Sequence, residues 1–353
     1  MQPIISMNQQ FISNPALYTN MILENSRTLD EWLPLYLEGL KDNITVNTYN
    51  NYSSYIYKHI LPELGSMKLT DLSAPIIKEF IVKKLQYGRI RIHNENRGLS
   101  TKTVKEHFVL LKKALDKAVE DGEMLYNPCH SISFPKQIKK EVHALEQEEQ
   151  AKLEEKITDE FIPDSPLTAK VALYAGLRNG EVCALKLKDI DLDKGLINVS
   201  KTLYRTRTEN NRTEIVISKT KNKRQRYVPI PDELKKSLER YINSMPDEKR
   251  NNPEQFLFEN KRGKPLEPRR LLFHFKMLLK DAGLGNIRFH NLRHTFATRC
   301  LECGIEMKIV SKILGHSTIQ ITADLYTHVT NRTMRNAMMK FNKENWINAY
   351  QNI

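Results

Sequence analysis

Two histidines and three arginines lie within residues 288–299, RFHNLRHTFATR, a stretch that otherwise has the composition of an apolar helix. His290 and Arg293 are three residues apart, so they share one face if the stretch is helical. Guanidinium groups suit the binding of anions, and imidazole exchanges a proton near neutral pH. Surface side chains with buried stems would give the same composition. A functional site therefore requires partners from other segments.

An arginine in a tight turn is a first candidate partner. Arg178 lies in AGLRNGE, between Gly176 and Gly180, which allow the backbone to turn sharply. Glu181 follows on the next expected helix and could pair with Arg178 or orient it. An arginine between glycines is more often structural than catalytic. This segment therefore indicates a functional site only in combination with other segments.

Three further segments add a lysine, a histidine and a tyrosine in order along the chain. SKTKNKRQR contains five basic residues between Lys219 and Arg226. His316 lies in LGHST, after a glycine expected to end one helix and before Ser317, which can cap another. Tyr326 comes ten residues later, in DLYTHV. Each segment alone has a structural explanation, but together they supply the side chains of a polar site on a basic protein.

The overall charge favours an anionic partner. The chain has 353 residues, with 55 lysines and arginines against 42 acids, a formal net charge of +13. Such an excess indicates nucleic acid or an acidic membrane surface. No apolar run approaches the roughly 20 residues that span a bilayer, and the N-terminal residues lack the pattern of a secretory signal. We therefore expect a protein of the cytoplasm.

The four cysteines predict neither a disulfide framework nor a metal site. Cys300 and Cys303 form a C-x-x-C pair, but no second pair completes a tetrahedral zinc site. Packed thiols in a reducing compartment are the simpler interpretation. We expect no metal and no cofactor.

The first third of the chain predicts a small all-helical domain. After a lead-in at 1–25, residues 26–128 carry apolar residues at helical spacing, with Ser73 and Ser100 as expected caps and Pro62, Gly65 and Gly122 as expected helix ends. The predicted helices cover 27–43, 46–64, 73–86 and 99–122. Lysines and tyrosines on their polar sides suit a surface that grips a DNA duplex, although a solvated helical bundle would look the same.

The remainder predicts a linker, a mixed domain and a tail. Residues 129–147 combine prolines with a basic cluster and are expected to link the domains. In 148–340, β-type segments at 195–204, 212–220 and 224–231 predict a small antiparallel sheet among helices. The polar tail 341–353 could dock on a neighbouring subunit or fold onto its own domain.

With these motifs, the sequence resembles the tyrosine recombinase family of the phage-integrase type over most of its length. The resemblance is carried by LSTKTVKEHFVLLKKALDKAVEDGEMLYNPC, GLRNGEVCALKLKDIDL, HNLRHTFAT and LGHSTIQITADLYTHV. Integrases of conjugative transposons and temperate phages look most similar. The implied fold is mainly α with a small antiparallel β-sheet. A helical, SAM-like core-binding domain and an α+β catalytic domain would form a C-shaped clamp around DNA.

The resemblance also implies roles for the residues of the site. Tyr326 would attack a DNA phosphodiester, leaving a 3′-phosphotyrosyl bond that stores the energy for rejoining without ATP or metal. Arg178 and Arg293 would bind the phosphate oxygens as forks, which lysine cannot do. His316 would donate a further hydrogen bond, and His290 would act as general base.

The lysine that protonates the leaving 5′-oxygen has two candidates. Lys219 resembles the lysine of the family's lysine–threonine pair, whereas the spacing back from Val228 indicates Lys221. Lys219 is preferred and Lys221 stays open. Glu181 is assigned a supporting role. The predicted DNA-binding residues are Lys102, Lys105, Lys223, Arg224 and Arg226.

The expected partners are double-stranded DNA at recombination sites and three further copies of the chain, as a homotetramer that exchanges strands through a Holliday junction. DNA-bending or excision proteins are further candidates, and the expected location is the bacterial nucleoid. Only the residues 1–25 precede the first expected helix, so an arm-binding domain is either unnecessary or missing. A type IB topoisomerase and a non-catalytic DNA-binding regulator are the alternative functions.

Overall fold

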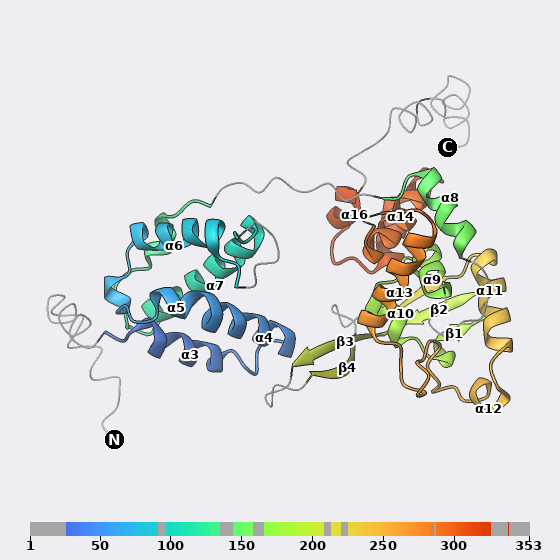
Figure 1. The fold of residues 1–353 in the computed structure, drawn as a ribbon, viewed down its shortest axis with the longest axis horizontal. Coiled ribbons are helices and arrows are strands. Elements are labelled where there is room, and N and C mark those ends of the chain that lie inside the picture. Colours follow the sequence, from blue (N-terminus) through green and yellow to red (C-terminus); the bar gives the residue numbers. More distant parts are fainter. Residues whose placement is uncertain are drawn as a thin grey trace, which may run out of the picture. The chain divides into compact units, whose positions relative to one another are not determined.

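The computed structural model describes residues 26–90, 97–134, 144–157, 166–207, 213–219, 225–285, 287–325 and 338 (Figure 1). The chain divides into two compact units, Met1–Lys139 and Lys140–Ile353. The predicted combination of helices with a small antiparallel strand content is confirmed. Within the described ranges, every helix is too short or too polar to cross a membrane.

The first unit is built from helices around one hydrophobic core. Its longest described helix, α7, begins where Ser100 accepts a hydrogen bond from the N–H of Thr103, as its role as N-cap predicted. Val104, Leu111 and Leu115 lie on the buried face of α7. The elements are α3 (Leu29–Gly39), α4 (Val46–Tyr55), η1 (Ile56–Ile60), α5 (Leu61–Leu64), η2 (Leu69–Asp71), α6 (Ala74–Tyr87), α7 (Thr101–Glu120) and η3 (Pro128–Ser131).

The helical stretch at 46–64 passes through Pro62 rather than ending there. Between α4 and α5, η1 is a segment of π-helix, and the N–H of Leu61 donates to the carbonyl of Ile56. Pro62 then occupies the first turn of α5, where its missing N–H costs little. The wider turn lets the chain accommodate a proline that would otherwise break an α-helix. Gly65 follows the end of α5 at Leu64, as predicted.

Packed structure extends into the predicted linker from both ends. Cys129 is fully buried in the core of the first unit. At the other end, the N–H of Leu145 donates to Oγ1 of Thr295, and its carbonyl accepts from Arg299. The segment that precedes α8 (Gln147–Lys156) is thus held against α14 (Phe289–Glu302), the helix that carries His290 and Arg293.

The second unit combines helices with two small antiparallel sheets. The segment 195–204, predicted as one strand, is divided at Ser200, so that β2 pairs with β5 and β3 pairs with β4. The first sheet has the order β1-β2-β5, and the β3–β4 hairpin forms the second. The strands are β1 (Ile190–Asp191), β2 (Leu196–Val199), β3 (Lys201–Arg207), β4 (Thr213–Lys219) and β5 (Arg226–Pro229).

The helices of this unit bury apolar side chains in a core of their own. The turn between α9 and α10, the C-terminal end of α15 and the first turns of α14 border one cavity. The helices are α8 (Gln147–Lys156), α9 (Leu167–Ala175), α10 (Asn179–Ala184), η4 (Leu187–Asp189), α11 (Asp232–Asn243), α12 (Asp247–Arg250), α13 (Pro268–Asp281), α14 (Phe289–Glu302), α15 (Met307–Leu314) and α16 (Ile319–Leu325).

Candidate active site

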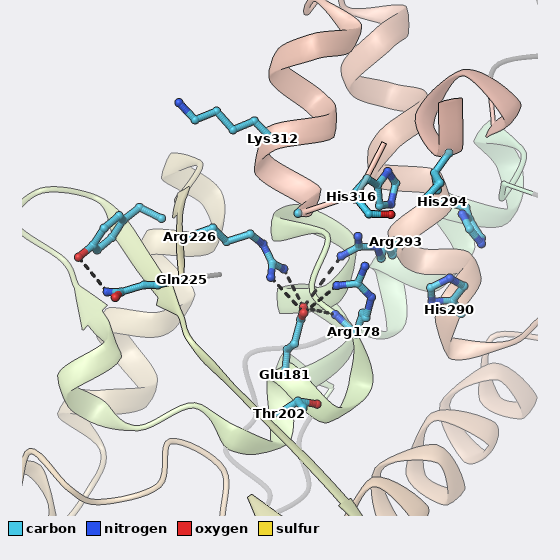
Figure 2. Close-up of a pocket in the computed structure, with 14 residues that line it drawn as sticks. Arg178, Glu181, Thr202, Gln225, Arg226, His290, Arg293, His294, Lys312 and His316 are labelled. Carbon is cyan, nitrogen blue, oxygen red and sulfur yellow. Dashed lines mark hydrogen bonds and ion pairs between the residues drawn. The ribbon is translucent and has the colours of Figure 1, made fainter. Parts of the chain in front are cut away.

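Four of the predicted catalytic residues line one cavity of about 850 Å³ in the second unit. They come from three separate segments of the chain, and Glu181 lies among them (Figure 2). The four are Arg178, His290, Arg293 and His316. The cavity is open and strongly basic, as a binding site for a phosphodiester would be.

A buried carboxylate lies at the centre of this basic cavity. Glu181 is 2% exposed, and dashed lines reach it from Arg178, Arg226 and Arg293 in Figure 2. Nη1 of Arg178 donates to its Oε1 at 2.8 Å, while Arg226 donates to both oxygens at 3.0 and 2.7 Å. The predicted pairing of Glu181 with Arg178 is therefore present. Burial alone would raise the pKa of Glu181, but the hydrogen bonds and charges of Arg226 and Arg178 lower it to about 2.

The two glycines that flank Arg178 have different structural roles. Gly176 ends α9 with φ +65°, a conformation that side chains with a Cβ disfavour. Gly180 is needed for close approach rather than for the turn, because an added Cβ would lie 2.6 Å from the carbonyl oxygen of Leu203 in β3. The N–H of Arg178 donates to Glu181, so the backbone and the side chain of Arg178 bind the same carboxylate.

Arg293 is a fully buried cation that ties two of these segments together. It is 1% exposed, and its guanidinium donates to the carbonyls of Gly176 at 2.7 Å and Leu314 at 2.6 Å. The same guanidinium lies 4.0 Å from Glu181. Burial and then the charge of Arg178 lower the pKa of Arg293 to about 9, so it stays charged at neutral pH.

The two histidines of α14 lie against each other in the cavity. The rings of His290 and His294 make an edge-to-face contact with centroids 4.4 Å apart. Burial, followed by the charges of Arg293 and Arg178, lowers the pKa of His290. His290 is consequently neutral at physiological pH and able to accept a proton. Within the described part of the chain, buried Nδ1 of His294 has no hydrogen-bond partner.

His316 is held by the helix that follows it. Gly315 ends α15 in a left-handed conformation, as the sequence predicted, and places His316 at the cavity. Nδ1 of His316 and Oγ1 of Thr322 share a hydrogen bond of 2.8 Å. Burial, followed by the charges of Arg293 and Arg178, lowers the pKa of His316 to about 4. The imidazole is therefore neutral at pH 7.

Apart from Arg226, the other predicted residues are not among those lining this cavity, or they lie outside the described ranges. Lys219 is exposed at the end of β4. Lys102 and Lys105 are exposed near the start of α7 in the first unit. Tyr326, Lys221, Lys223 and Arg224 fall outside the residues that the structure describes.

Arg226, predicted as a DNA-binding residue, lies at the cavity itself. Its side chain is 9% exposed and lies against Glu181, because β5 begins at this residue and directs it inward. His294 and Thr322 were missed by the sequence reasoning. His294 could have been found, since it lies four residues after His290 and so shares its helix face.

Among the described residues there is no cluster of three or more side chains able to hold a metal ion.

Comparison with protein families gives the assignment that this site suggests. The phage integrase family matches residues 134–333, and the N-terminal SAM-like domain of phage integrases matches 28–85. The chain belongs to the phage integrase family. It is a tyrosine recombinase, an enzyme that cleaves and rejoins DNA.

Relatives of known name agree with this assignment. A tyrosine recombinase XerC-like protein of Caldanaerobacter subterraneus subsp. tengcongensis is 33% identical over 312 residues, covering 83% of this chain and 75% of the relative. Tyrosine recombinase XerC of Bacillus subtilis is 29% identical over 297 residues, covering 82% and 90%.

Solved structures share the fold of this tyrosine recombinase. The Tn1549 transposon integrase in complex with a circular intermediate DNA matches with a TM-score of 0.73 and 23% identity, covering 89% of this chain and 100% of that one. A lambda integrase tetramer bound to a Holliday junction matches with a TM-score of 0.65 and 21% identity, covering 85% and 78%.

Proposed function

We propose that this tyrosine recombinase is the integrase or transposase of a mobile element. It cleaves DNA strands through Tyr326, forms a 3′-phosphotyrosyl bond and releases a 5′-hydroxyl. Rejoining to a partner strand reverses the same transfer, so the phosphoester energy is kept and ATP is not required. The observation that carries the proposal is the convergence of Arg178, His290, Arg293 and His316 on one basic cavity.

Arg178 and Arg293 neutralise the charge that develops on the non-bridging oxygens of the scissile phosphate. Arg178 suits this role because its side chain is 40% exposed while one of its nitrogens is anchored to Glu181. Arg293 adds a fixed charge from the inner wall. Both are positioned before DNA arrives, so little reorganisation accompanies the reaction.

The two histidines have separate tasks. His290, neutral because burial and two arginines lower its pKa, accepts the proton of Tyr326. The hydroxyl of Thr322 can donate to Nδ1 of His316. In that tautomer the ring proton lies on Nε2 and donates to the phosphate. Lys219, or else Lys221, protonates the departing 5′-oxygen.

The deciding experiment traps the covalent intermediate. The full chain is incubated in EDTA with a nicked duplex that carries the element end, and the products are separated on a denaturing gel. Wild-type protein should give an SDS-resistant adduct, and Tyr326→Phe should give none while it binds DNA with unchanged affinity. Tyr227→Phe, at an exposed tyrosine that lines the same cavity, is the matched control and should still form the adduct. An adduct that persists in Tyr326→Phe refutes the nucleophile assignment.

Strand exchange separates recombination from the topoisomerase alternative. Two cognate sites on separate duplexes should give recombinant products and a Holliday junction intermediate, made by a tetramer like that of the lambda integrase structure. Relaxation of supercoiled DNA without exchange would favour a type IB topoisomerase. Binding without any cleavage would favour a regulator.

A further inference from the structure

Arg226 makes hydrogen bonds to two elements that border the active site. Its Nη1 and Nη2 form a fork on the two oxygens of Glu181, at 3.0 and 2.7 Å. Its Nε donates to the carbonyl oxygen of Ile313, at 2.8 Å. One guanidinium on β5 therefore joins α10 to the last turn of α15. A lysine could not make both connections, because its single ammonium lacks the planar fork.

Each end of this connection leads to a residue of the proposed reaction. Glu181 holds Arg178 through a 2.8 Å hydrogen bond. Ile313 belongs to the last turn of α15, directly before Gly315 and His316. A shift of Arg226 would consequently displace both Arg178 and His316.

The charges explain why a second arginine is useful at Glu181. A buried carboxylate with Arg178 as its main partner would draw that guanidinium inward, away from the phosphate. Because Arg226 donates hydrogen bonds to both oxygens of Glu181, Arg178 uses only one of its side-chain nitrogens for this carboxylate. The remaining donors of Arg178 are left for DNA.

The chain before His316 runs directly over the stem of Arg226. Gly315 has φ +66°, and a Cβ added there would lie 2.9 Å from Cδ of Arg226. The backbone that leads to His316 therefore packs closely against the side chain of Arg226. The side chain of Arg226 lines the cavity but is only 9% exposed, because most of its surface is packed against neighbouring residues.

We propose that Arg226 is a positioning residue for strand cleavage, which orients Arg178 through Glu181 and His316 through Ile313 without itself binding DNA. The proposal rests on the proposed function, since its effect is on the cleavage step. A displacement of about 1 Å in such groups can cost about 100-fold in rate.

The test separates DNA binding from cleavage in Arg226→Ala and Arg226→Lys. Single-turnover cleavage should fall about 100-fold in Arg226→Ala and about tenfold in Arg226→Lys, which keeps the charge but loses the fork. DNA affinity should stay within about twofold, and its salt dependence should be unchanged, whereas a lost phosphate contact would lower the slope by about one. Arg250→Ala, at an exposed arginine paired with Asp247, is the control and should cleave normally.

Two further readouts distinguish positioning from a general loss of structure. Millimolar guanidinium should restore part of the cleavage by Arg226→Ala and none by Tyr326→Phe. The effects of Arg226→Ala and Glu181→Gln should be less than additive, because both break the same connection. If the alanine variant unfolds, the lysine variant still gives the comparison.

The outcomes are distinct. Normal cleavage by folded Arg226→Ala or Arg226→Lys overturns the positioning role. A loss of affinity that matches the loss of cleavage, with a smaller salt slope, makes Arg226 a DNA contact and also overturns it. A wild-type protein that forms no adduct overturns the proposed function together with this inference.

Discussion

Glu181 shows how a single buried residue organises the charges of the site. Its carboxylate is surrounded by Arg178, Arg226 and Arg293, so the cluster keeps a net positive charge. Burying one anion among cations in this way is favourable only when its oxygens are hydrogen-bonded, and here both are. The surplus charge is available for a phosphodiester.

The ionisation of His290 leads to a prediction for the pH dependence of cleavage. Burial, Arg293 and Arg178 lower its pKa below the ordinary 6.5, so the base form persists into mildly acidic solution. The second-order rate constant for cleavage, which reports groups of the free enzyme, should fall in acid as His290 is protonated. The midpoint of this fall should lie below pH 6.5.

This pH profile is measured at DNA concentrations well below those that saturate the enzyme, and the affinity for DNA is determined at each pH. His290→Gln should cleave slowly and lose the acidic fall. A fall centred above the ordinary histidine pKa in the wild-type protein would contradict the role of His290 as the base.

At the scale of residues, the sequence predicted that Arg178, Arg293 and two histidines come together, because the types and order of these side chains are tied to the chemistry. It did not predict the place of Arg226. In SKTKNKRQR every basic residue looks alike, and only the pairing of β5 with β2 turns Arg226 inward. The bond of His316 to Thr322 was equally hidden, because helix α16 must fold back before the two side chains meet.

Among the elements, α7 contains a histidine whose burial costs stability. His107 is fully buried between His59 and Tyr55, and neither of its ring nitrogens has a hydrogen-bond partner in the described part of the chain. Burial, then His59 and Lys84, lower its pKa to about 4. The unfolded chain therefore binds more protons than the folded one between about pH 4 and the ordinary value of 6.5.

His107→Leu should consequently stabilise the protein and reduce its acid sensitivity. The wild-type free energy of unfolding is expected to fall as pH drops below 6.5, by at most about 3 kcal/mol from this residue. The leucine variant should be more stable by about 1 kcal/mol at neutral pH, because it buries no unsatisfied nitrogen. Its stability should also depend less on pH.

Urea denaturation at several pH values from about 7 to about 5 measures both effects. His130→Gln, at an exposed histidine of the same unit, controls for the simple loss of an imidazole. A leucine variant less stable than the wild type, with the same pH slope, would show that the stacked histidines contribute to packing rather than oppose it.

The elements themselves were largely predictable because apolar periodicity and caps are local signals. The helix predicted over 46–64 and closed by Pro62 and Gly65 is helical as far as Leu64. It is not one α-helix, because the π turn of η1 changes the hydrogen-bond register before the proline. The division of the predicted strand at Ser200 was also missed. Whether a strand continues or changes partner depends on pairing with distant residues, which no local pattern contains.

For the whole molecule, the net charge of +13 and the two compact units agree with a protein that holds DNA over a large surface. Composition predicted an anionic partner, either nucleic acid or an acidic membrane surface. It could not predict a DNA sequence, because phosphate contacts dominate affinity and only a few base contacts give specificity. The family resemblance supplied the order of the two domains. The structure adds the detailed arrangement within each.

The C-terminal tail 341–353, which lies outside the described residues, carries the prediction for assembly. Phe341, Trp346 and Ile347 are large apolar side chains in an otherwise polar segment, and such residues are typical anchors of protein interfaces. A chain that ends at residue 340 should bind a single DNA site with near-normal affinity but assemble poorly into tetramers. Trp346→Ala should behave similarly, and Asn348→Ala is the matched control.

Size-exclusion chromatography with light scattering gives the assembly state of the protein–DNA complexes. Titration of a half-site duplex gives the affinity. Because single-site binding uses the DNA-facing surfaces alone, a tail that docks on a neighbouring subunit affects only the first measurement. A tail that folds onto its own domain would lower the stability of the isolated chain instead. Wild-type assembly by the shortened chain would therefore assign the three apolar residues to their own subunit.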